Sequence, residues 1–219
     1  GLLAVTDRLL GVEPMAPAVS SFLLATVMAH AGSPEMGEPA VSRLEEIGAA
    51  TDAPTILSMA FLARGRLTHD TDPSSASRCY VEALDLAQSV DNLLIATQAR
   101  WAIADLSALS EPRAALADLA VVLDDLQVGD DAQQQQTLLA ALAPLVALEA
   151  DDPALLIAAT LRDTVWARSV RYRTATERLY GRVGGPTVDA AIRRVQLLGP
   201  ARVRSSVVAA IGELTAHGA

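Results

Sequence analysis

Lysine is absent from this chain of 219 residues, and all 17 of its basic residues are arginine. A phosphate-binding P-loop requires a lysine in its motif, and a Schiff-base enzyme requires a lysine as its nucleophile. Both classes of site are therefore excluded within this sequence.

Cysteine and histidine are almost as scarce. The single cysteine, Cys79, excludes an internal disulfide and a site built from several thiolates. It lies among apolar residues at helical spacing, so we expect a buried structural residue. A nucleophilic cysteine would need a histidine partner, which the pattern does not supply. His30, His69 and His217 have no metal-ligand spacing, so no metal is predicted.

Aromatic residues make up only 3% of a chain that is 51% hydrophobic. Alanine and leucine supply most of the apolar side chains, and both favour helices. Strands favour valine, isoleucine and aromatic residues, and strand-like alternation is nowhere sustained. The sequence therefore predicts an all-α protein.

Long hydrophobic runs are also missing. The stretch "FLLATVMAHAG" is too short to span a membrane, and no basic segment precedes it as in a signal peptide. We therefore expect a cytoplasmic protein without membrane contact. Because the chain begins at Gly1 without an initiator methionine, we also expect it to be part of a larger polypeptide.

What the sequence does contain is a repeat. Pro34, Pro73, Pro112 and Pro153 stand 39, 39 and 41 residues apart, and each follows a polar or acidic residue. Such a residue caps free N–H groups, and proline at the first helical position loses no hydrogen bond. The stretches "TDAP", "VDNL" and "GDDA" are again 39 residues apart. Each period therefore contains the starts of two helices.

A single helix hairpin cannot bury its own apolar face, whereas stacked hairpins share one continuous core. We predict a solenoid of antiparallel helix hairpins with a period of about 39 residues over residues 1–165. The resemblance of the hairpins to tetratricopeptide-like repeats implies a right-handed superhelix. The predicted hairpins cover 16–50, 51–89, 90–128 and 129–165, after a leading helix or remnant unit at 2–12. Gly37, Pro39 and Pro144 weaken the pattern in the first and fourth hairpins. Residues 166–219 predict an arginine-rich C-terminal helical cap.

The hairpins resemble tetratricopeptide-like repeats, although the standard period is about 34 residues. Small residues fall where such helices pack closely: Ala60, Ala76, Ala83, Ala99, Ala115 and Ala120. The phrases "DAPTILSMAFLARGRL", "SSASRCYVEALDLAQSVDN" and "PALLIAATLRDTVWAR" are similar to the helical-repeat region of large ATP-driven (STAND-type, MalT/LuxR-like or cyclase-linked) bacterial transcriptional regulators. Such arrays commonly end in an "AA.LRG" helix, a loop and a tyrosine-containing helix. The stretch "AATLRDTVWARSVRYRTATERLYGRV" is similar to this ending and has the same order.

This resemblance covers about residues 35–215, and neither a P-loop nor a recognisable helix-turn-helix motif lies in the sequence. It implies that ATP and DNA are bound by other parts of such a regulator, so no cofactor is expected in this chain. The segment itself would hold a small-molecule inducer, a protein partner or other domains of the same polypeptide.

In tetratricopeptide-like stacks the first helices line a concave groove. Four side chains are predicted to face a common ligand there: Phe61, Arg64, Arg100 and Gln135. Arg64 and Arg100 occupy nearly equivalent positions on successive first helices, and guanidinium groups suit carboxylates or phosphates. The alternative is that both arginines are solvated, or paired with Asp70 and Asp105.

Charge is unevenly distributed along the chain. Residues 1–161 hold 22 acidic groups and 7 arginines, whereas residues 162–219 hold 10 arginines and 4 acidic groups. Arginine and aromatic residues interleave in the latter: Arg162, Trp166, Arg168, Arg171, Tyr172, Arg173, Arg178 and Tyr180. We predict an interface with an acidic surface, inside or outside the protein, through Trp166, Arg168, Arg171 and Tyr172. The net charge of −9 argues against DNA contact through this segment.

The acidic doublets, among them Asp151-Asp152, lie mostly at turns or helix starts, where the helix dipole favours negative charge. They therefore do not indicate a catalytic pair. The leading hypothesis is a non-catalytic ligand-sensing or protein-interaction domain of a larger ATP-dependent transcriptional regulator. The alternative is a stand-alone adaptor that holds a peptide or protein partner in its concave groove. An enzyme would require a compact polar cluster in a closed pocket, and the sequence shows none beyond helix caps.

Overall fold

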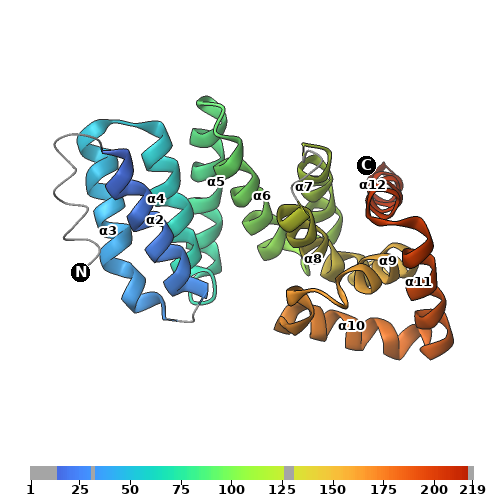
Figure 1. Ribbon diagram of the computed structural model, residues 1–219. Coiled ribbons are helices and arrows are strands. Elements are labelled where there is room, and N and C mark those ends of the chain that lie inside the picture. The colour runs from blue at the N-terminus through green and yellow to red at the C-terminus, as the bar shows by residue number, and fades with distance from the viewer. Residues whose placement is uncertain (1–13, 31–32, 126–130, 217–219) are drawn as a thin grey trace. The chain divides into compact units, whose positions relative to one another are not determined.

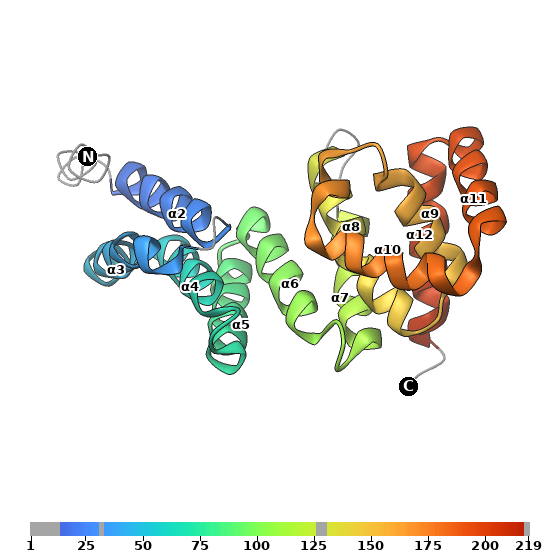
Figure 2. The same ribbon diagram turned by 90° about the horizontal axis from the view of Figure 1, so that it is seen from below.

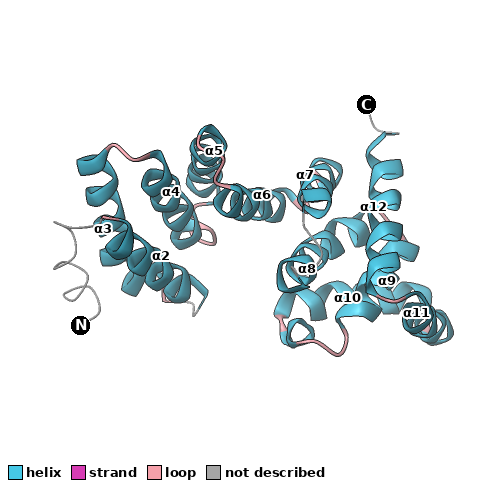
Figure 3. Cartoon of the chain, turned by 45° about the horizontal axis from the view of Figure 1, so that its top comes forward, coloured by secondary structure: helices cyan, strands magenta, loops and turns pink. Residues whose placement is uncertain are grey.

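A computed structural model of the protein describes residues 14–30, 33–125 and 131–216. These residues form eleven α-helices and one short 3-10 helix, and no strand occurs among them (Figure 3). The prediction of an all-α protein is confirmed. The chain divides into two compact units, the first ending at Leu106 and the second beginning at Ser107.

The first unit contains five described helices. They are α2 (Met15–His30), α3 (Pro34–Thr51), α4 (Pro54–Thr68), α5 (Pro73–Ser89) and α6 (Leu93–Ser107), the last of which ends at the unit boundary. Helices α2 to α5 run side by side, and α4 contacts α2, α3 and α5 (Figure 1). The core includes Leu44 of α3, Leu62 of α4, Tyr80 of α5 and Ile95 of α6.

The helices of this unit begin where the sequence places prolines and caps. Pro34, Pro54 and Pro73 are the first residues of α3, α4 and α5. The Asp72 carboxylate accepts a hydrogen bond of 3.0 Å from the backbone N–H of Ser75, which satisfies one free donor at the start of α5. The Asn92 side chain accepts from the N–H of Ile95 in the same way at the start of α6.

The second unit contains the remaining helices. They are α7 (Pro112–Asp125), α8 (Asp131–Ala147), α9 (Asp151–Leu161), the 3-10 helix η2 (Val165–Arg168), α10 (Val170–Val183), α11 (Gly185–Leu198) and α12 (Pro200–Ala216). Helix α10 lies across α8 and α9, as the view from below shows (Figure 2). Helix α11 packs on α9, and α12 packs on α7 and α9 and buries Val203, Val207 and Ile211.

The interruptions expected at Gly37, Pro39 and Pro144 do not end a helix, because α3 and α8 continue through them. Gly37 is a point of close approach, since a Cβ atom there would lie 2.8 Å from Cδ2 of Leu67 on α4. The superhelix, its period and the division into repeats and cap remain predictions. The predicted leading helix at 2–12 lies outside the described residues.

Candidate binding surfaces

Arg64, predicted to face a ligand, is held by two glutamates of α3. Its Nε and Nη2 atoms donate to the two carboxylate oxygens of Glu45 at 3.0 and 2.9 Å, and its Nη1 atom donates to Glu38. The hydrogen bonds to Glu45 raise the pKa of Arg64 above its usual range. The sequence offered Asp70 as an alternative partner of Arg64, whereas the structure pairs Arg64 with Glu38 and Glu45. A ligand carboxylate would have to compete with two carboxylates already in place.

The other predicted groove residues are spread over both units. Phe61 is half-buried on α4 and packs against the core of the first unit, and Arg100 is half-buried on α6. Gln135 is half-buried on α8 of the second unit. The positions of the two units relative to one another are not determined, so a common face that includes Gln135 remains a prediction.

A different arginine, Arg66, joins three helices of the first unit. From α4, its Nη1 atom donates to Oγ1 of Thr26 on α2 at 2.8 Å, and its Nη2 atom donates to Oε1 of Gln98 on α6 at 2.6 Å. Its guanidinium carbon lies 5.5 Å from the ring centroid of Phe22, within the range of a cation–π contact. Sequence reasoning missed this residue, because α4 is apolar on almost every side and offers no polar stripe that marks a face.

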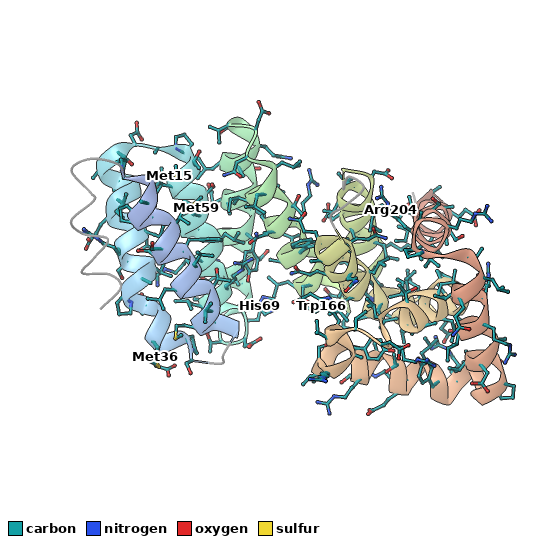
Figure 4. All side chains as sticks on the ribbon, viewed as in Figure 1. Met15, Met36, Met59, His69, Trp166 and Arg204 are labelled. Atoms are coloured by element: carbon teal, nitrogen blue, oxygen red, sulfur yellow. The ribbon has the colours of Figure 1, made fainter. Side chains whose placement is uncertain are left out.

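His69, labelled in Figure 4, follows α4 and contacts side chains of α5 and α6. Its Nδ1 atom lies 3.0 Å from the Tyr80 hydroxyl, and its Nε2 atom lies 3.1 Å from a carboxylate oxygen of Asp105. Tyr80 is 1% exposed, so its hydroxyl is not available to a substrate. The contacts of His69 with Tyr80 and with Asp105 therefore connect the end of α4 to α5 and α6.

The predicted C-terminal interface residues occupy different environments. Tyr172 is buried, and its hydroxyl donates to the carbonyl oxygen of Ala158 at 2.7 Å. Burial raises the pKa of Tyr172 above its usual range. Trp166 is half-buried in η2 (labelled in Figure 4), and Arg168 is exposed. The side chain of Arg171 lies outside the described residues.

Part of the arginine-rich segment contacts acidic residues inside the second unit. Arg182 of α10 forms an ion pair with Asp151, and Arg194 of α11 donates to Asp152 at 2.7 Å. The acidic doublet at the start of α9 thus anchors two helices that the sequence predicts as a cap. Arg168, Arg173 and Arg178 form no ion pair with a described residue.

Apolar residues are exposed beside these arginines. Val165 is 75% exposed and Val170 is 69% exposed, on either side of Arg168. We call Val165, Trp166, Arg168 and Val170 the η2 patch. Exposed valines next to a guanidinium that has no ionic partner among the described residues are typical of a surface that contacts a partner of opposite charge and apolar character.

Among the described residues, no three His, Cys, Asp or Glu side chains are grouped to hold a metal ion. In the same part of the chain, no helix combines the length and the apolar character needed to cross a membrane. Comparisons of the chain with protein-family models, curated proteins and solved structures gave no match.

Proposed function

We propose that this chain is a non-catalytic ligand-sensing and protein-interaction module of a larger ATP-dependent transcriptional regulator. The packing of α2 on α3, of α4 on α5 and of α8 on α9 supports this proposal, together with the sequence resemblance to the helical arrays of such regulators. ATP would be bound by other parts of the regulator. A stand-alone adaptor is the alternative, and a nucleotide-binding or DNA-binding segment in the same reading frame would remove it.

The observation that carries the binding role is the η2 patch. Its valines expose apolar surface to water, and Arg168 lacks an ionic partner among the described residues. The partner that fits this surface is an acidic segment with apolar side chains, in another domain of the same polypeptide or in a second protein. Such a contact would bury the valines and compensate the charge of Arg168.

A photo-crosslinking amino acid at position 170 tests the proposal in the cells that naturally produce the protein. We expect crosslinks from position 170 to one acidic segment, identified by mass spectrometry. The matched control is position 81, because Val81 on α5 is also an exposed valine, at 45%. Equal crosslinking from both positions, or none from position 170, would contradict the proposed role.

A further inference from the structure

Arg66 is a cation held by uncharged groups. Its two hydrogen-bond acceptors are the hydroxyl of Thr26 and the amide oxygen of Gln98, and its third neighbour is the ring of Phe22. Arg66 forms no ion pair with a residue that the structure describes. The two bonds use two of the five N–H groups of a guanidinium, which leaves three without a described protein acceptor.

Burial makes this arrangement costly. Arg66 is half-buried, and a charge partly removed from water is normally compensated by an opposite charge. Burial lowers the pKa of Arg66 below its usual value, whereas the glutamates around Arg64 raise the pKa of that neighbour. The same helix therefore carries one arginine with two carboxylates and one with none among the residues that the structure describes. An anion from outside the described residues would supply what Arg66 lacks.

The surroundings of Arg66 indicate the kind of anion. Leu23 lies three residues before Thr26 on α2, and Leu94 lies four residues before Gln98 on α6, so each is on the same side of its helix as an Arg66 partner. Leu23 is 56% exposed and Leu94 is 51% exposed. Both neighbouring helices, α2 and α6, thus expose an apolar side chain on the side of an Arg66 partner. These side chains suit a ligand whose body is apolar.

The charge of the unit limits how many negative charges the ligand carries. Residues 1–106 contain 13 acidic groups and 6 arginines, so the unit as a whole repels polyanions. One guanidinium without an ionic partner in the described part of the unit matches one carboxylate, which it can bind through two parallel hydrogen bonds. A nucleic acid or a polyphosphate is disfavoured on the same grounds.

We propose that Arg66, together with Gln98 and Thr26, forms a binding site for an apolar monocarboxylate on the face shared by α2, α4 and α6. The carboxylate accepts hydrogen bonds from Arg66, and the apolar body covers Leu23 and Leu94. This inference rests on the proposed binding role and names its ligand class. Its failure would leave the crosslinking test of the η2 patch unaffected, because that patch belongs to the other unit.

Titration calorimetry on the full chain tests the site with two acids. Octanoate represents a free small acid, and a short peptide with a free C-terminal leucine represents a chain end. Octanol and the corresponding peptide amide are the uncharged controls. We expect saturable binding of at least one acid and none of its control, and the acid that binds identifies the source of the carboxylate. Absence of saturable binding by both acids would overturn the proposal.

The decisive variant is Gln98→Glu, which places an internal carboxylate beside Arg66. It should weaken binding of the acid by roughly tenfold to a hundredfold, because the new carboxylate competes with the ligand. It should also raise the melting temperature, so loss of binding would not reflect unfolding. Gln88→Glu, at an exposed position of α5, adds the same charge away from Arg66 and should bind like the original chain. Equal affinities of the two variants would overturn the site.

Discussion

Two arginines of α4 have opposite environments although only Gly65 separates them. Arg64 contacts Glu38 and Glu45 of α3, whereas Arg66 contacts uncharged groups of α2 and α6. Two positions along a helix turn a side chain by about 200°, so the two guanidinium groups reach different neighbours. Which of them is available to a ligand depends on this rotation, and not on residue type.

Gly65 itself is required by close packing. A Cβ atom there would lie 2.4 Å from Cε1 of Tyr80, whose ring is buried and whose hydroxyl contacts His69. We expect Gly65→Ala to lower the free energy of unfolding by about 1–3 kcal/mol, since the ring must move and its contact with His69 is disturbed. Urea denaturation followed by circular dichroism measures the change.

Gly181 of α10 provides the control. No atom lies within 4 Å of a Cβ built at Gly181, and alanine is the better helix former. Gly181→Ala should therefore raise stability by about 0.5–1 kcal/mol. If both substitutions stabilise the protein, Tyr80 does not depend on the small residue at position 65.

At the scale of helices, the sequence is most informative where a terminus has its own chemistry. The prolines that start α3, α5 and α7 and the Asp72 cap are local signals, so they could be read without the structure. The face that each helix presents is harder to predict. Helix α4 buries eight residues around most of its circumference, because it is covered by α2, α3 and α5. No apolar stripe remains to distinguish Arg64 from Arg66.

Pro39 is the point where α3 departs from its sequence preference. It is exposed and lies inside the helix, so it removes one backbone hydrogen bond without filling core space. We expect Pro39→Ala to raise the free energy of unfolding by about 1–3 kcal/mol in urea denaturation. Pro144→Ala in α8 should gain less, because Pro144 is buried and its ring atoms would leave a void. An unchanged or lower stability of Pro39→Ala would contradict this explanation.

At the scale of the whole molecule, only some arginines of the arginine-rich segment form ion pairs with acidic groups among the described residues. The Asp151-Asp152 doublet takes Arg182 and Arg194, whereas Arg168, Arg173 and Arg178 retain no ionic partner in the part of the chain that is described. Composition alone predicted an acidic counterpart for the arginine-rich segment, but it could not say which arginines would meet it inside the unit. Which arginines form ion pairs inside the unit depends on how α10 and α11 pack on the start of α9.

Amide hydrogen exchange of residues 162–173 tests the binding role most directly. The exchange rates of the isolated chain are compared with those of the protein purified with its partners from the cells that produce it. A contact over the η2 patch predicts slower exchange in this segment of the assembled protein, with unchanged rates in α5. Identical rates in the two samples across residues 162–173 would contradict a partner on this surface.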